Sequence, residues 1–149
     1  MTQPGTTAVR LLLLTASLCA YWHVWLDIGT IGIRDQESSH VLLVPLVSLF
    51  LVWTRVREQR GSTGRKEAEP NFRDHALALG LILSSAVMHE VGLKYGILAA
   101  WHASAVLCSY GALTATFGVR QLRKHLPAVV LLLGVIPVPG LLRQQLALH

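Results

Sequence analysis

Cysteine and histidine are the side chains of this sequence that could serve nucleophilic or acid–base chemistry. Cys19 and Cys108 both lie inside apolar runs, and neither has a second cysteine at CxxC spacing, so neither a zinc site nor a disulfide framework is indicated. A reactive thiolate needs an electropositive, partly exposed setting that lowers the thiol pKa. The sequence around Cys108 supplies no such setting, and we interpret this cysteine as a packing residue.

Three histidines were considered as functional residues. His40 stands at the entrance to an apolar run, where its imidazole could line a pocket or simply mark the start of a helix. His89 and Glu90 could form a proton-relay pair, because ionisable groups inside membrane spans are often functional. Because they lie at the end of an apolar run, the interpretation that both are solvated residues at the edge of a span is favoured instead. His102 has only apolar residues at the i±3 and i±4 positions, and we predict neither a metal site nor a cofactor.

The composition of the chain is that of an integral membrane protein. Of its 149 residues, 52% are hydrophobic and only 14% are charged, whereas soluble domains carry about 25% charged residues. The net charge of +5 is carried by residues that lie between the apolar runs. Such a placement is typical of membrane topology signals. The lipid bilayer is therefore the predicted partner, and nucleic acid is not.

The apolar runs predict an all-α, polytopic helix bundle that forms a single transmembrane domain over residues 1–149. Its five predicted spans cover about residues 9–27, 40–56, 75–91, 97–119 and 126–142. The first run could be a cleavable signal peptide, but it continues beyond the length of a typical apolar signal region. A polar, glycine-containing stretch at 57–74 predicts a cytoplasmic loop.

Small residues recur at every fourth position of the fourth run, at Gly96, Ala100, Ser104, Cys108, Ala112 and Thr116. The third run has a shorter version of this stripe, at Ala76, Gly80 and Ser84. Small side chains let helix backbones approach closely, and close packing drives helix association in lipid. We therefore expect the third and fourth runs to pack as an antiparallel pair.

The distribution of Lys and Arg predicts the orientation of the spans. With the N-terminus inside, ten of the thirteen Lys and Arg residues fall on the cytoplasmic side and three fall outside, namely Arg34, Lys94 and Arg143. Cytoplasmic segments of membrane proteins carry such an excess of positive charge. The predicted N-terminus is therefore cytoplasmic, and His40 lies on the same, outer side as Pro137 and Pro139.

Two stretches of the sequence resemble one family. Residues 39–46, SHVLLVPL, are followed by SLFLVW at 48–53 and then by arginines; this pattern resembles the SHG-LVP-LW-arginine signature of exosortases and archaeosortases. The later apolar run, which ends in Pro137-Val138-Pro139, resembles the PxP element of the same family. The residues that match the family motifs are His40, Pro45, Pro137 and Pro139.

This resemblance implies a multi-pass protein of the bacterial inner membrane. The family is proposed to act as cysteine transpeptidases or proteases on secreted proteins that bear a C-terminal sorting signal. This chain has Val41 where the family usually has glycine, and it ends at His149, whereas the catalytic Cys, Arg and His of the family follow the PxP element.

We therefore expect an N-terminal half that is inactive alone, without a catalytic residue of its own. A partner chain would then carry the missing helices, and whether the chain is itself an enzyme stays open. The alternative is a small non-enzymatic membrane scaffold or transporter subunit. A proton-coupled transporter should carry a carboxylate in mid-span, whereas Asp27 and Glu90 lie at the ends of runs.

Overall fold

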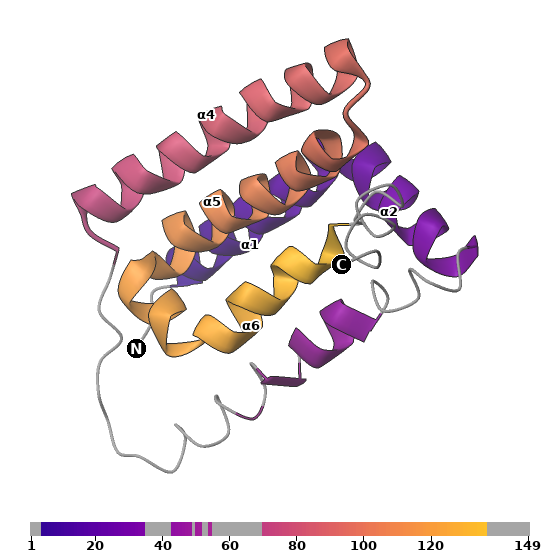
Figure 1. The fold of residues 1–149 in the computed structure, drawn as a ribbon. Coiled ribbons are helices and arrows are strands. Elements are labelled where there is room, and N and C mark those ends of the chain that lie inside the picture. Colours follow the sequence, from indigo (N-terminus) through magenta and orange to yellow (C-terminus); the bar gives the residue numbers. More distant parts are fainter. Residues whose placement is uncertain (1–3, 35–42, 49, 52–53, 55–69, 137–149) are drawn as a thin grey trace, which may run out of the picture.

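The computed structural model describes residues 4–34, 43–48, 50–51, 54 and 70–136, and all regular secondary structure within them is helical. The predicted all-α class is therefore confirmed for these residues. The helices are α1 (Pro4–Ala20), α2 (Trp22–Arg34), α4 (Phe72–Tyr95), α5 (Leu98–Lys124), α6 (Leu126–Leu131) and the 3₁₀ helix η2 (Leu132–Val135). Residues 43–48 are also helical and lie beside α6 (Figure 1).

Helix α5 is the central element, and α1, α2, α4, α6 and η2 all contact it. The small-residue stripe predicted for this helix is buried over its whole helical part, at Ala100, Ser104, Cys108, Ala112 and Thr116. The predicted pairing of the third and fourth runs is confirmed, because α4 and α5 lie side by side and share the largest helix–helix contact (Figure 1).

The prediction of which small residues of the third run form the helix contact is wrong. Ala76, Gly80 and Ser84 are exposed, and the buried residues of α4 are Ala78, Ser85 and Gly92. A spacing of seven residues returns to almost the same helix face, so Ala78, Ser85 and Gly92 form the one buried face of α4. The contact at the end of α4 is close: a Cβ atom on Gly92 would lie 2.6 Å from the backbone nitrogen of Trp101.

Large apolar side chains cover the outside of the bundle, and its interior is small and partly polar. On α4, Leu77, Leu79, Leu83 and Val87 are each at least half exposed. The buried residues include Ser85, His102, Ser104, Thr114 and Thr116. Small and hydroxyl-bearing residues at helix interfaces, with apolar residues outside, are typical of helices packed in lipid. Among the described residues, length and composition identify α4 as one possible membrane span, and the bent pair α1 and α2 as a second if it forms one span.

The first predicted span is not one straight helix. The chain breaks at Tyr21, and the axes of Ala8–Ala20 and Trp22–Arg34 differ by 67°. The Tyr21 hydroxyl lies 2.9 Å from Ser85 Oγ on α4, which ties the break to the bundle. Helix α2 then continues to Arg34, where a loop from residue 27 was expected, because Val24, Ile28 and Gly32 form a buried face at helical spacing.

The boundaries of the third run follow from its caps. Helix α4 begins at Phe72 and thus includes the last residues of the predicted loop, since Asn71 and Asp74 form a capping box with two hydrogen bonds of 3.0 Å. The helix continues to Tyr95, where a turn from Gly92 was expected. It ends at Gly96, which adopts a left-handed conformation with φ of 66°, a conformation that glycine adopts without steric cost.

The fourth and fifth runs also differ from the predicted spans. Helix α5 extends through the basic segment to Lys124 and is kinked at Gly118, where φ is 75° and ψ is 157°. The fifth run divides into α6 and η2, and its remaining residues lie outside the described part of the chain. Two backbone carbonyl groups of α6 accept hydrogen bonds from side chains. The Ser48 hydroxyl donates to the carbonyl of Ala128, and the Tyr110 hydroxyl donates to the carbonyl of Val129.

Candidate functional site

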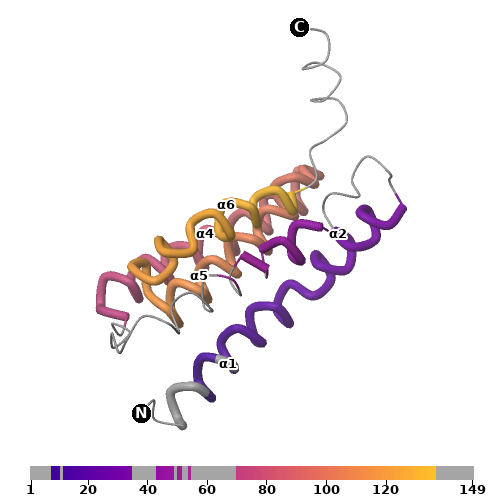
Figure 2. Tube along the Cα trace, turned by 90° about the horizontal axis from the view of Figure 1, so that it is seen from below, coloured from indigo at the N-terminus to yellow at the C-terminus, as the bar shows by residue number. Residues whose placement is uncertain are grey.

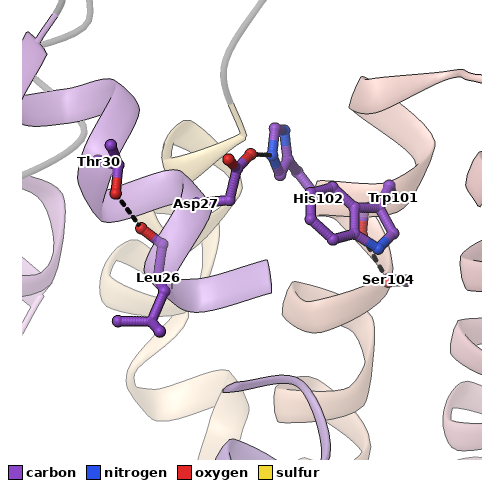
Figure 3. Close-up of polar contacts among 6 residues, drawn as sticks. All are labelled: Leu26, Asp27, Thr30, Trp101, His102 and Ser104. Carbon is purple, nitrogen blue, oxygen red and sulfur yellow. Dashed lines mark hydrogen bonds and ion pairs between the residues drawn. The ribbon is translucent and has the colours of Figure 1, made fainter. Parts of the chain in front are cut away.

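A carboxylate–imidazole pair joins α2 to α5 near the turn that connects α4 and α5. Asp27 Oδ2 lies 2.8 Å from His102 Nε2 (Figure 3). His102 is buried, with an exposed fraction of 1%, whereas the Asp27 side chain is 41% exposed. The imidazole therefore lies in the interior, and the carboxylate connects it to the surface of the bundle.

A small apolar cluster positions this pair. Val24 and Ile28 of α2 are buried against Ala105 of α5 and Val135 of η2. Asp27 is three residues after Val24 and one before Ile28, so the packing of this face brings its carboxylate to α5. The indole ring of Trp101 lies 5.3 Å from the imidazole of His102, with an angle of 40° between the ring planes, and limits its movement.

The carboxylate of Asp27 determines which nitrogen of the imidazole carries the proton between the two groups. A carboxylate only accepts hydrogen bonds, so Nε2 of His102 carries the proton that is shared with Asp27. The other nitrogen, Nδ1, is buried and has no hydrogen-bond partner in the described part of the chain. A histidine held by a carboxylate in this way has a defined tautomer and ring orientation.

A second set of polar contacts lies deeper between α4 and α5. Ser85 donates to the carbonyl of Ile82 at 2.8 Å, so the Tyr21 hydroxyl donates to Ser85 Oγ. His89 Nδ1 lies 3.4 Å from Ser104 Oγ, and the rings of His89 and Tyr21 meet edge to face at 5.3 Å.

The structure does not bring His89 and Glu90 together as a proton relay. His89 is half-buried in this polar set, whereas Glu90 is exposed. The expectation of two solvated edge residues therefore holds for Glu90 only.

The two cysteines lie in different environments. Cys108 is buried at the contact between α4 and α5, with an exposed fraction of 6%, and this agrees with its interpretation as a packing residue. Cys19 is exposed on α1. In the part of the chain that the structure describes, no group of three or more His, Cys, Asp or Glu side chains could hold a metal ion.

Three of the four family-motif residues, His40, Pro137 and Pro139, lie outside the described residues. Pro45 is exposed within the helical residues 43–48. The neighbours of both motifs are described, and they meet in space. Val44, which belongs to the first motif, and Leu132, which precedes the PxP element, both pack against the cluster of Val24, Ile28, Ala105 and Val135.

An open apolar groove runs along the same two segments. It has a volume of about 460 Å³ and is lined by Val44, Leu126, Pro127, Val130, Leu131 and Gly134. Residues 43–48 and α6 lie side by side in both views of the molecule (Figures 1 and 2). The groove is lined by residues 43–48, α6 and η2, whereas Asp27 and His102 lie on α2 and α5. Val44 lines the groove and also packs against the apolar cluster beside the pair.

Sequence analysis alone did not identify the Asp27–His102 pair. His102 was examined for partners on its own helix, but its partner is 75 residues away in the chain. The available signal was the predicted topology, which places the end of the first run and the start of the fourth run on the same side of the membrane. Trp25 and Trp101 pack against the apolar cluster beside the pair.

Comparison with known proteins gives one match. A family model described as transmembrane exosortase matches residues 25–149, a range that includes both Asp27 and His102. No curated protein and no solved structure matches the chain.

Proposed function

Because the chain belongs to the transmembrane exosortase family, we propose that it acts within the membrane on secreted proteins that carry a C-terminal sorting signal. Membership of this family also makes it a membrane-embedded protein, in contact with the lipid bilayer. The exposed apolar side chains of α4 and the small, partly polar interior are the surface and core that such an environment requires.

The proposed topology has five spans in one domain, with the N-terminus in the cytoplasm of a bacterium and the protein in its inner membrane. The asymmetry of Lys and Arg supports this orientation. In this orientation the Asp27–His102 pair lies at the outer boundary of the membrane. A secreted protein would reach that boundary as it leaves the cytoplasm.

The observation that carries the proposal is the meeting, at one end of the bundle, of part of the first motif with the segment that precedes the second. Val44 and Leu132 are far apart in the chain, yet both pack against the apolar cluster beside Asp27 and His102. A family signature divided between two distant segments is expected to form one site. We therefore assign to this end the binding and positioning of the sorting signal.

We assign no nucleophilic role to either cysteine of the chain. Cys108 is packed between α4 and α5, and Cys19 is exposed on an apolar helix face. Neither environment resembles the electropositive, partly exposed setting of a reactive thiolate. A transpeptidase or protease step would need a nucleophile other than these two thiols, and a second polypeptide could bring it.

The test is co-purification with a defined substrate. The full chain is expressed in a bacterial membrane together with a secreted reporter that carries a C-terminal sorting signal, and it is recovered in mild detergent. We expect the reporter to co-purify, and a reporter with a scrambled signal to be lost. Equal recovery of the two reporters would contradict the proposal and favour a scaffold or transporter subunit.

A further inference from the structure

The Nδ1 atom of His102 is a buried polar atom without a hydrogen-bond partner among the described residues. The side chain is almost completely buried, and no described residue offers a hydrogen bond to this nitrogen. Leaving a buried polar atom unpaired destabilises a folded protein, and native structures rarely tolerate it. This nitrogen therefore indicates a ligand.

The tautomer of His102 defines the chemistry of that ligand. With Nε2 donating to the carboxylate of Asp27, an imidazole in its neutral form keeps a lone pair on Nδ1. Asp27 and Trp101 hold the ring in one orientation (Figure 3). The site therefore accepts a hydrogen bond and selects a ligand that brings an N–H or O–H donor into the interior.

The burial of His102 favours a neutral donor over a charged one. A lipid ammonium group would need to lose its hydration to reach Nδ1, which costs far more than burying an amide N–H. Such a cation would be attracted to the half-exposed carboxylate of Asp27 before it reached the imidazole. An amide N–H is the donor that every extended polypeptide presents, whatever its side chains.

We infer that His102, oriented by Asp27, accepts a hydrogen bond at Nδ1 from a main-chain N–H of an extended polypeptide segment. This inference rests on the proposed function and names the contact by which the sorting segment would be held. Asp27 stands beside Ile28 in α2 and His102 beside Trp101 in α5, and Ile28 and Trp101 belong to the apolar cluster or pack against it. Recognition through the main chain would tolerate different side chains in the bound segment.

The first measurement uses a matched pair of histidine variants in the full chain. A glutamine places its amide nitrogen near the position of Nε2, so His102→Gln keeps the donor to Asp27 and removes the acceptor at Nδ1. His23→Gln changes an exposed histidine on the same helix as Asp27 and serves as the control. The probe is a synthetic peptide with a C-terminal sorting signal and a photoreactive residue. It is added to vesicles of phosphatidylethanolamine and phosphatidylglycerol that contain the protein.

We expect His102→Gln to raise the half-saturating peptide concentration about fivefold to tenfold, the effect of one lost hydrogen bond. His23→Gln should not change it. A second measurement needs no substitution and is therefore independent of any folding defect. In the unsubstituted chain with ¹⁵N-labelled histidine, the Nδ1 resonance of His102 should shift when the peptide is added to the vesicles.

The outcomes separate this inference from the proposed function. Equal peptide capture by the unsubstituted chain and by His102→Gln would overturn the inference while the proposed function stands. No capture by the unsubstituted chain would overturn both. A shift of the Nδ1 resonance that follows the phosphatidylethanolamine content, without peptide, would assign the site to a lipid donor and overturn the polypeptide ligand.

Discussion

At the scale of single residues, Asp27 and His102 form a polar contact at the end of the bundle where α4 turns into α5. A half-exposed carboxylate holds a buried imidazole at 2.8 Å, and the ring has one nitrogen left for a ligand. A histidine buried in this way is stable only with a partner on at least one nitrogen. The contact therefore contributes to folding as well as to the proposed site.

Removal of the Asp27 carboxylate should destabilise the protein. Asp27→Ala leaves both nitrogen atoms of His102 without a protein partner, and we expect the free energy of unfolding to fall by about 1–2 kcal/mol. Water can reach the exposed side of residue 27 and limits the loss. Unfolding by sodium dodecyl sulfate in mixed micelles measures this change.

Glu90→Ala is the matched control, because Glu90 is an exposed acidic residue near the same end of the bundle. Its effect should remain within about 0.5 kcal/mol. Equal unfolding free energies for Asp27→Ala and the unsubstituted chain would show that the pair contributes nothing to stability.

The residue scale is where the sequence was least informative. Burial of Cys108 was predicted correctly from the small residues on its own helix. The partner of His102 was missed, because hydrogen bonds between residues on different helices depend on how those helices cross. Periodicity within one run contains no information about that crossing.

At the scale of the elements, α4 and α5 are held together by close backbone contact. Gly92 lies against the backbone of Trp101, and Gly111 lies against Ile82 and the carbonyl of Ala78. Small residues permit this approach, and the larger apolar side chains of α4 are left facing outward. The pairing of the two helices could be predicted from the stripe on α5.

The face that α4 presents to α5 could not be predicted, because the helix carries two sets of small residues. Ala76, Gly80 and Ser84 were chosen, whereas Ala78, Ser85 and Gly92 form the contact. The break at Tyr21 was also missed. No proline or glycine stands at this position in the sequence. The break is stabilised by the hydrogen bond between the Tyr21 hydroxyl and Ser85 on another helix.

A methyl group at Gly92 should separate α4 from α5. In Gly92→Ala the added Cβ would meet backbone atoms of Trp101 at 2.6 and 2.8 Å. Backbone cannot move aside as a flexible side chain can, so we expect a loss of about 1–3 kcal/mol in the free energy of unfolding.

Gly80→Ala on the same helix provides the comparison, because no atom lies within 4 Å of its added Cβ. Alanine favours the helical conformation over glycine, so this variant should unfold no more easily than the unsubstituted chain. If both variants lost the same stability in the same mixed-micelle assay, the close contact at Gly92 would not be supported.

The kink of α5 depends on Gly118. Its φ of 75° and ψ of 157° lie in a region that is almost restricted to glycine. An added Cβ would also lie 3.0 Å from Asp74 Oδ2. The same carboxylate accepts hydrogen bonds from the backbone N–H groups of Asn71 and Val119, which joins the start of α4 to the kink.

We expect Gly118→Ala to reduce the free energy of unfolding by about 1–3 kcal/mol. Limited proteolysis after the basic residues Arg120 and Arg123 should accelerate, because the segment that follows the kink would be displaced. Gly29→Ala, with open space around its Cβ, serves as the control. Proteolysis at the same rate in all three proteins would mean that the kink does not position this segment.

At the scale of the whole molecule, composition and run length were sufficient to predict an all-α membrane protein. The family could be recognised from two short motifs, and the family match over residues 25–149 agrees with that reading. The arrangement of the helices required the structure. Only there do Val44 of the first motif and Leu132, which precedes the second, meet α2 and α5 at the Asp27–His102 end.

The proposed function requires this end to face the outside of the membrane, where secreted proteins arrive. Lys94 and Arg73 lie at opposite ends of α4, and a helix of 24 residues is about 36 Å long, enough to cross the bilayer core. Each position can therefore report one side of the membrane. Cys19→Ser and Cys108→Ser provide a background without thiols.

The most direct test is labelling of Lys94→Cys and Arg73→Cys, one at a time, with a membrane-impermeant maleimide on intact bacterial spheroplasts. We predict that Lys94→Cys is labelled at once and that Arg73→Cys is labelled only after the membrane is permeabilised. The reverse pattern would place the Asp27–His102 pair in the cytoplasm. It would contradict a role in holding secreted proteins at the outer face.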